Sequence, residues 1–387
     1  LAWLLLRFPP AVKAFNAITA GVNPVILFAN DGSRFVFGNL GGSDGPWGFV
    51  FAFQVLPIII FFASLMAILY HWGVMQRVIA ALAWVLRTSL GVTGTESLSM
   101  AANVFVGQTE APLCVRPYIA GMTRSQIAAL MTGGFATIAG SVLAAYVGIL
   151  GGDDEAARIL YAKHLLTASV LSAPAALVIA KIMFPETESP ADESIRSIRM
   201  ERTTRNTLDA AAAGATDGLR LAVNVGAMLI AFVALLAMLN WPLAWLGERA
   251  WLQPILERHG VETLSIQVLL GWLFMPLAWT MGVPWEDCDA FGALLGEKLI
   301  ATEFIAYLSL AREMHTDDPL ISARAAQIAT YALCGFANFP SIAIQIGGLT
   351  ALAPTRRSDF ATLGLRCMIG GALASWMTAS IAGLFIV

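Results

Sequence analysis

Charged residues are scarce in this sequence. Asp, Glu, Lys and Arg make up 13% of its 387 residues, whereas 58% are hydrophobic and the mean hydropathy is +0.72. Soluble domains contain about 25% charged residues, so this chain has too little polar surface to face water on all sides. Four apolar runs approach or exceed the ~20 residues that a helix needs to cross a membrane: Phe49 to Leu69, Leu165 to Phe184, Leu221 to Leu239 and Gly364 to Val387. The sequence therefore predicts an all-α integral membrane protein with several spanning helices.

Several functional motifs are also missing. The four cysteines stand far apart without a CxxC pair, and the four histidines show no ligand spacing, so neither a disulfide framework nor a zinc site is expected. The formal net charge of −3 offers no basic face for nucleic acid. The chain has no GxxxxGKS/T phosphate-binding loop, which argues against direct use of ATP. It also has no GxSxG nucleophile elbow and no HExxH zinc motif, which argues against enzymatic activity. We expect no enzyme and no organic cofactor.

The loops suggest an orientation. Lys and Arg are enriched in cytoplasmic loops. The segment from Pro185 to Asp209 carries four arginines and the segment from Leu352 to Arg366 carries three, so both are expected inside. The acidic loops Leu150 to Ala162 and Ala311 to Pro319 are expected outside. The chain opens with Leu1 rather than Met, and its first eight residues look like the tail of a helix, so we expect that a further N-terminal segment precedes them.

Two halves of the chain repeat a pattern. The segment Gln126-Ile127-Ala128 is followed by Gly134-Phe135-Ala136, and Gln327-Ile328-Ala329 is followed at the same interval by Gly335-Phe336-Ala337. A Thr-Glu pair precedes each: Thr109-Glu110 and Thr302-Glu303. The loop charges give the two copies opposite directions across the membrane. Inverted repeats of this kind are common in secondary transporters, which hold their substrate near the midplane between the halves.

Each repeat contains residues that interrupt a helix. The first has a glycine-rich stretch from Gly133 to Ser141, and the second runs from Gly335 through Pro340 to Ser341. Glycine loosens a helix, and proline removes a backbone donor and clashes with the preceding turn. In lipid the freed backbone groups need partners from protein, ion or water. Close helix packing through small residues is the alternative, but it explains the proline-containing stretch poorly.

Two carboxylates lie in apolar stretches that are too short to span the membrane uninterrupted. Glu110 lies in residues 104–112 and Glu303 in residues 299–305. A carboxylate at the bilayer centre costs roughly 2.5–3.5 kcal/mol, so it is retained mostly for function or for a firm partner. Each stretch fits a re-entrant hairpin with its tip at mid-depth. A capping or ion-pairing role is the alternative for either Glu alone, whereas their matching places in the repeat favour a shared cavity.

Two other polar groups receive structural interpretations. Thr93 and Glu96 have the spacing of a capping box at a helix start. Glu297 and Lys298 are adjacent, which suggests a local ion pair or a pair whose long side chains extend to the membrane surface. Neither group is expected to bind substrate.

Three motifs in order resemble the concentrative nucleoside transporters. They are the segment from Gly107 to Pro112, Glu297-Lys298-Leu299 with Thr302-Glu303-Phe304, and the segment from Gly335 to Ile342. The similarity covers nearly the whole chain from about Phe35 onward. It implies a multi-helix transporter with two inverted-repeat re-entrant hairpins and discontinuous transmembrane helices, assembled as a homotrimer in the inner membrane of a bacterium.

The resemblance also implies binding residues. Those expected at the nucleobase are Gln108, Thr109, Glu110 and the apolar wall Val142. Those expected at the ribose are Glu303, Asn338 and Ser341, with Phe336 nearby. The chemistry agrees, because a carboxylate can accept protons from two hydroxyls and Gln or Glu can pair with the polar edge of a base.

A sodium site is implied between the first hairpin and the first broken helix. Its ligands would be the side chains of Asn103 and Thr137 and the carbonyls of Val106 and Ile138. Thr137 stands where Ser is expected but keeps the hydroxyl, and Pro340 stands where Ser is common. Hard oxygen ligands, partly from unwound backbone, suit a small alkali cation.

The resulting hypothesis is sodium:nucleoside symport by alternating access. The expected partners are a uridine-like substrate, sodium and membrane lipid. The first alternative is proton coupling through Glu110 or Glu303. A solute channel and an intramembrane enzyme are less favoured alternatives.

The sequence also predicts a division into four parts. Residues 1–90 form a scaffold whose first helix is missing, and residues 91–184 form a first repeat. Residues 185–265 contain a linker, a scaffold helix and an external loop, and residues 266–387 form a second repeat.

Overall fold

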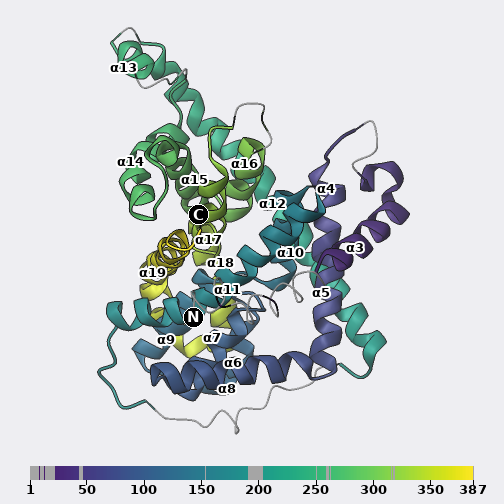
Figure 1. Cartoon of the computed structure of the whole chain (residues 1–387). Coiled ribbons are helices and arrows are strands. Elements are labelled where there is room, and N and C mark those ends of the chain that lie inside the picture. The colour runs from purple at the N-terminus through teal and green to yellow at the C-terminus, as the bar shows by residue number, and fades with distance from the viewer. Residues whose placement is uncertain are drawn as a thin grey trace.

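The structure is a computed structural model that describes residues 22–42, 47–152, 154–190, 204–249, 251–258, 263–314 and 319–386, together with residues 8, 13, 261 and 316. Within these residues every regular element is a helix, as the sequence predicts (Figure 1). Five segments are long and apolar enough to cross a membrane, and they contain most of the four apolar runs: 51–71, 124–151, 155–183, 207–247 and 354–383. The expected helix tail at residues 1–7 and three arginines of the charged linker (Arg196, Arg199 and Arg202) lie outside the described residues.

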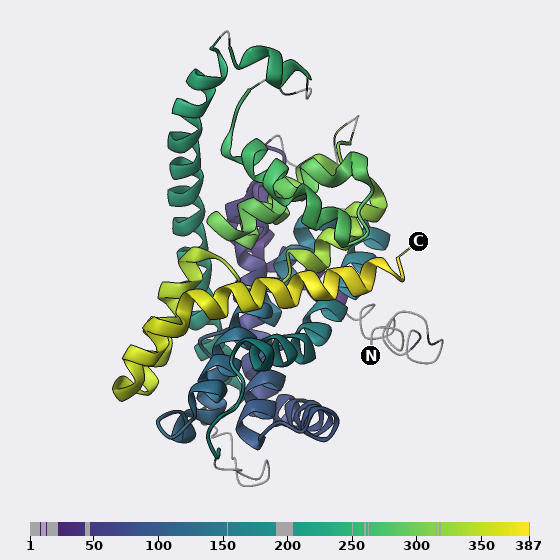
Figure 2. The same ribbon diagram turned by 90° about the vertical axis from the view of Figure 1, so that its left-hand side faces the viewer.

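A scaffold is built around two long helices, α5 (Leu56–His71) and α12 (Thr207–Gly247). They pack closely because α12 presents Gly214 and Gly218 to α5: a Cβ atom on Gly214 would lie 2.6 Å from the Cβ atom of Ala67. Figure 2 shows α12 along one edge of the molecule, leading to α13 (Gln253–Arg258) at one end. Three shorter elements precede α5: α3 (Val22–Phe37), η1 (Gly38–Gly41) and α4 (Phe51–Gln54).

The two sequence repeats fold into matching series of helices. Helix α6 (Val74–Leu90) precedes the first repeat, which contains α7 (Gly94–Asn103), η2 (Ala111–Val115), α8 (Arg116–Ile119), α9 (Arg124–Ala136), α10 (Gly140–Gly151) and α11 (Glu155–Met183). The second contains α14 (Ile266–Thr280), η3 (Trp285–Asp287), α15 (Cys288–Ile300), α16 (Glu303–Met314), α17 (Ala323–Ala332), α18 (Phe339–Leu352), η4 (Pro354–Arg356) and α19 (Arg357–Gly383). The predicted repeat is therefore confirmed, and α19 crosses the body of the molecule in Figure 2.

Each repeat contains a helical hairpin. Arms α7 and α8 form the first hairpin, with residues 104–110 at its tip, and arms α15 and α16 form the second, with Ala301 and Thr302 at its tip. The start of α7 is fixed by the predicted capping box, in which the Thr93 hydroxyl accepts from the Glu96 N–H and Glu96 accepts from the Thr93 N–H. Lys181 of α11 forms an ion pair with Glu96 at 2.6 Å, which attaches this hairpin to a spanning helix.

The two broken helices are also present. Helix α9 ends at Ala136, and three extended residues separate it from α10. Helix α17 ends at Ala332, and six non-helical residues separate it from α18. Gly335 causes the second break, because its φ of +120° lies outside the range that other residues readily adopt. Pro340 does not break a helix as its sequence position suggested; it lies in the first turn of α18, where proline is well tolerated.

Candidate functional site

The two helix breaks lie against each other. The Phe336 N–H donates to the Thr137 carbonyl at 3.3 Å, so the backbone of one break is hydrogen-bonded to the other. A Cβ atom on Gly335 would lie 2.8 Å from the backbone of both Phe135 and Ala136, so this crossing has no room for a side chain. The repeats therefore meet at the residues where each spanning helix is interrupted.

The first hairpin tip packs onto the first break. The Gly140 N–H, at the start of α10, donates to the Phe105 carbonyl at 2.9 Å. Asn103, the last residue of α7, is completely buried, and a Cβ atom on Gly133 of α9 would lie 3.2 Å from its Nδ2 atom. The Thr137 hydroxyl donates to the Gly133 carbonyl at 2.8 Å, so Asn103 and Thr137 both lie beside the same glycine.

This corner contains polar atoms that lack partners. Neither Oδ1 nor Nδ2 of Asn103 has a hydrogen-bond partner among the described residues. The carbonyls of Val106 and Ile138 lie outside helices, and no described N–H donates to them. Leaving a buried polar group unpaired costs about 1–3 kcal/mol, so a bound cation would stabilise this cluster. The four residues predicted to bind sodium thus supply oxygen atoms with free lone pairs at one corner of the fold.

The second hairpin places Glu303 at the first turn of α16. Its side chain is 3% exposed and accepts two hydrogen bonds, from the Tyr146 hydroxyl at 3.0 Å and from the Asn338 amide at 2.7 Å. The Asn338 Oδ1 atom accepts from the Ser341 N–H at 2.9 Å, which caps the start of α18. Glu303, Asn338 and Ser341 therefore form one buried group, as predicted for the ribose, and Phe336 is half-buried near it.

Tyr146 is a member of this group that sequence reasoning missed. It is fully buried on α10, one helical turn beyond the predicted wall residue Val142, so both lie on one face of that helix. Its ring also packs against Tyr307 and Phe304 of α16, with ring centroids 4.2 and 4.8 Å apart. The sequence could have indicated Tyr146, because it is a polar aromatic residue one helical turn after Val142.

A second cluster joins the first hairpin tip to α9 and α18. Gln108 is 6% exposed, and its Oε1 atom has no partner among the described residues. Gln345 of α18 donates to the Met131 carbonyl at 3.0 Å, and its Oε1 atom is likewise unpaired in the described chain. A Cβ atom on Gly134 would lie 2.3 Å from Gln345 Nε2 and 3.0 Å from Gln108 Cβ, so the two glutamines flank this glycine. Gln345 was not predicted, although it lies one turn after Ser341.

The remaining predicted base-site residues have different environments. Thr109 contacts α18, since a Cβ atom on Gly348 would lie 2.9 Å from the Thr109 methyl group. Val142 is buried, whereas Glu110 is exposed and its carboxylate lies next to Gly107. The two carboxylates that occupy matching places in the repeat are therefore not equivalent: Glu303 is enclosed and hydrogen-bonded, and Glu110 is open to solvent.

Lys298 of α15 is also in a different environment from the one expected. Its side chain is completely buried, and its amine donates to the carbonyls of Ala332 at 2.9 Å and Cys334 at 3.4 Å. The interpretation of Glu297 and Lys298 as a local ion pair or as a pair reaching the membrane surface is therefore wrong. The carbonyls at the end of α17, rather than the neighbouring carboxylate, therefore supply the acceptors for this ammonium.

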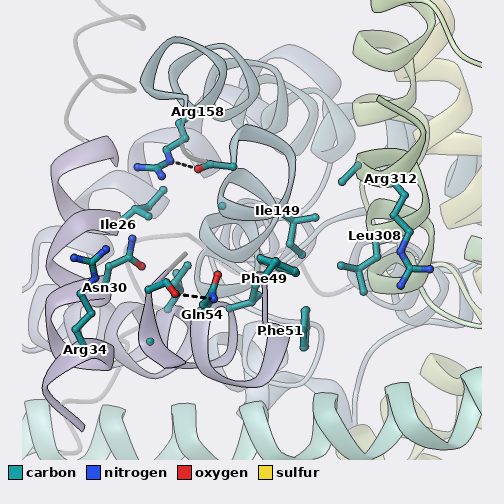
Figure 3. A pocket seen from close by; sticks show the side chains of 17 residues that line it. Ile26, Asn30, Arg34, Phe49, Phe51, Gln54, Ile149, Arg158, Leu308 and Arg312 are labelled. Atoms are coloured by element: carbon teal, nitrogen blue, oxygen red, sulfur yellow. Dashed lines mark hydrogen bonds between the residues drawn. The ribbon is translucent and has the colours of Figure 1, made fainter. Parts of the chain in front are cut away.

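A separate cavity of about 600 Å³ lies between the scaffold and the repeats (Figure 3). Helices α3 to α5 line one wall, and α10, α11 and α16 line the other. Figure 3 shows Leu308 and Arg312 of α16 facing Ile149, Phe49 and Phe51 from the opposite side. None of the predicted site residues lines this cavity. In the part of the chain that the structure describes, no group of three or more His, Cys, Asp or Glu residues could hold a metal ion.

Comparisons with known proteins give a consistent result. Residues 164–383 match the family model described as the C-terminus of the Na⁺ dependent nucleoside transporters, residues 1–40 match its N-terminal counterpart, and residues 52–153 match a nucleoside recognition gate. An uncharacterized transporter of Haemophilus influenzae is 46% identical over 387 residues, which cover 100% of this chain and 88% of that protein. Sodium/nucleoside cotransporter 1 of Rattus norvegicus is 42% identical, and the match covers 100% of this chain but 58% of the rat protein.

Solved structures agree with these relatives. CNTnw in an inward-facing, substrate-bound state is 42% identical, superposes with a TM-score of 0.88, and the match covers 99% of this chain and 88% of that one. A substituted form of CNTnw in an outward-facing state gives a TM-score of 0.87 at 41% identity, with coverage of 99% of this chain and 88% of that one. The sequence motifs, the paired hairpins and these similarities together establish that the chain belongs to the family of Na⁺-dependent, concentrative nucleoside transporters.

Proposed function

We propose that this chain imports nucleosides by sodium symport and that the crossing of the two helix breaks couples the ion to the substrate. The observation that carries the proposal is the hydrogen bond from the Phe336 N–H to the Thr137 carbonyl. Thr137 belongs to the predicted sodium corner, and Phe336 lies two residues before the predicted ribose ligand Asn338. An ion that orders the first break therefore also acts on the second, through one backbone contact.

The ribose would bind at Glu303. Each of its carboxylate oxygens already accepts one hydrogen bond, so each retains a lone pair for a sugar hydroxyl. Tyr146 and Asn338 would hold the carboxylate in place, and Ser341 and Phe336 would complete the pocket. A diol with two adjacent hydroxyls matches the two oxygens of one carboxylate, which favours a ribonucleoside such as uridine.

The nucleobase would bind at the first hairpin, against Gln108, Thr109, Glu110 and Val142. The unpaired Oε1 atom of Gln108 is a hydrogen-bond acceptor suited to an N–H group of a base. Glu110, which is exposed in this structure, would be accessible to a base that enters from solvent. Val142 supplies an apolar surface for the ring.

Sodium would bind at Asn103, Thr137 and the carbonyls of Val106 and Ile138. The Asn103 side chain is buried without a partner, and a cation would satisfy its oxygen. The Thr137 hydroxyl donates its proton to the Gly133 carbonyl, which directs its lone pairs away from that carbonyl. These are hard oxygen ligands, as an alkali cation prefers.

Transport would proceed by movement of the repeats against the scaffold. We assign residues up to 90 and 185–265 to the scaffold side, and 91–184 and 266–387 to the two repeats. The cavity of about 600 Å³ between α3–α5 and α10, α11 and α16 leaves room for such movement. In the most apolar stretch of each of the spans 51–71 and 207–247, only 17% of the residues are buried. These helices therefore offer apolar surface for lipid or for neighbouring protomers of a homotrimer. A bacterial inner membrane is the proposed location, supported by the similar transporter of Haemophilus influenzae.

Uptake by reconstituted protein tests this function. Proteoliposomes should concentrate radiolabelled uridine above the external level when an inward sodium gradient is imposed, and not when a proton gradient alone is imposed. Accumulation driven by protons would favour proton coupling instead. Equilibration without accumulation would indicate a channel, and chemical alteration of the recovered uridine would indicate an enzyme.

A further inference from the structure

One face of helix α18 joins the proposed ribose pocket to the proposed base pocket. Ser341, Gln345 and Gly348 are spaced by four and three residues, so they lie on the same face of this helix. Gln345 lies about 6 Å beyond Ser341 along the helix axis, because each helical residue adds about 1.5 Å. The first hairpin packs against this part of the face, since a Cβ atom on Gly348 would lie 2.9 Å from the Thr109 methyl group. A nucleoside with its ribose at Ser341 and its base at the first hairpin would therefore extend along α18 toward Gln345.

The amide of Gln345 has a fixed orientation. The side chain is 1% exposed, and its Nε2 atom donates to the Met131 carbonyl of α9 at 3.0 Å. A carbonyl can only accept a hydrogen bond, so the amide cannot exchange its nitrogen and oxygen by rotation without losing this contact. Its Oε1 atom is therefore held as an acceptor, and no donor from the described residues reaches it.

A second unpaired acceptor lies close to the first. A Cβ atom on Gly134 would lie 2.3 Å from Gln345 Nε2 and 3.0 Å from Gln108 Cβ, so both side chains border the same point. The Oε1 atom of Gln108 is also buried, and the described part of the chain offers it no donor. Burial of an acceptor without a donor is unfavourable, so a ligand that donates to both oxygens would be bound favourably here.

We propose that Gln345 is a further substrate-binding residue, which forms with Gln108 a pair of acceptors for the exocyclic amine of a nucleobase. The proposal rests on the base site proposed above and assigns its preferred substrates to one class, the nucleosides with an amino group on the base, such as cytidine and adenosine. The nitrogen of such an amine carries two hydrogens, one for each glutamine oxygen. Uridine has a carbonyl in place of the amine and donates a single N–H from its base, so it can satisfy only one of the two oxygens.

A comparison of two ligands tests this role. Cytidine and the pyrimidin-2-one ribonucleoside, which is cytidine without its amine, are titrated calorimetrically into the purified protein at saturating sodium. The unsubstituted protein should bind cytidine roughly 30-fold more tightly, because each of two neutral hydrogen bonds contributes a factor of about five. Gln345→Met keeps the length of the side chain but removes the acceptor, so it should reduce this preference to about fivefold. A purely structural role of Gln345 would weaken both ligands alike and leave the ratio of their affinities unchanged.

Two other variants complete the test. Gln327→Met is the matched control, because Gln327 is a half-buried glutamine of α17, on a different helix from the proposed acceptors, and it should keep the full preference. Gly134→Ala leaves Gln345 in place but puts a methyl group where the Gln345 amide now lies, so it should also lower the preference for cytidine.

The outcomes separate this proposal from the proposed function. Equal affinity of the unsubstituted protein for the two ligands would overturn the proposal even if neither variant folds, and so would a folded Gln345→Met protein that keeps the full preference. Sodium-driven uptake of uridine and cytidine would persist in either case, and the proposed function would stand. Absence of sodium-driven uptake of both nucleosides by the unsubstituted protein would refute the proposed function itself.

Discussion

Substitution of Glu303 by Gln is the most direct test of the proposed ribose group, because the structure restricts how the new amide can orient. The Asn338 amide at one carboxylate oxygen can only donate, whereas the Tyr146 hydroxyl at the other can rotate and accept. The glutamine NH₂ group must therefore face Tyr146, and its oxygen must face Asn338. The site then offers one neutral acceptor to the sugar where it had two charged ones.

The size of the effect follows from this count. One ribose hydroxyl loses its acceptor, and the other exchanges a charged acceptor for a neutral one. Hydrogen bonds to charged groups contribute about 1.5–3 kcal/mol and neutral ones about 1 kcal/mol, so the combined loss should be about 2–5 kcal/mol, or roughly 30- to 4000-fold in the uridine dissociation constant. The side-chain volume hardly changes, so the fold should persist.

Calorimetric titration of the purified protein with uridine at saturating sodium measures this change. Glu188→Gln is the matched control, because Glu188 is exposed in the segment after α11. Titration with 2′,3′-dideoxyuridine separates ribose recognition from other effects, since a ligand without the diol should bind the Glu303→Gln and unsubstituted proteins equally. Uridine affinity within a few-fold of the unsubstituted value, or an equal loss for the dideoxy ligand, would refute the assignment of the diol to Glu303.

Three further outcomes are expected. Asn103→Ala should raise the half-saturating sodium concentration of uridine uptake by more than about tenfold, whereas an unchanged value would remove Asn103 from the sodium site. Lys181→Met should lower stability by about 3 kcal/mol in a melting assay, because it removes the cation that pairs with the buried Glu96 carboxylate; a melting temperature equal to that of Lys163→Met would contradict this. Gly214→Val should destabilise the scaffold by about 1–3 kcal/mol or more, because its Cβ atom would lie 2.6 Å from Ala67 Cβ. Gly226→Ala on the same helix is the control and should be nearly neutral, since its Cβ atom would make only an ordinary contact at 3.5 Å. Equal melting temperatures of the two variants would refute the packing argument.

Much of the helical order could be predicted from the sequence because its signals are local. Apolar length marks spanning helices, Thr93 with Glu96 marks a helix start, and the matching segments around Gly134 and Gly335 mark the repeat. Pro340 shows the limit of such signals. Proline stops a helix in its interior and is favoured in its first turn, and only the conformation of Gly335 places the break before it.

The side-chain partners could not be predicted in the same way. Tyr146 and Glu303 are 157 residues apart, and Gln345 and Met131 are 214 apart, so their contacts depend on how helices from different repeats face one another. Lys298 was misinterpreted because the sequence places Glu297 beside it, whereas its partners are carbonyl groups 34 and 36 residues away that are free only because α17 ends early. Backbone groups exposed by a helix end carry no sequence signal of their own.

Equivalent positions in the two repeats have acquired different chemistry around one shared contact. Thr137 and Asn338 correspond in the repeat, and each lies beside the hydrogen bond that joins the breaks. The Thr137 hydroxyl bonds to its own helix and can offer lone pairs to a cation, whereas the Asn338 amide bonds to Glu303 and can orient an acceptor for a sugar. Because both residues lie at the same crossing, we expect a change at either one to shift the backbone of the other. The proposed ion site at Thr137 and the proposed substrate site at Asn338 would therefore be coupled by the geometry of the crossing itself, without a longer chain of contacts between them.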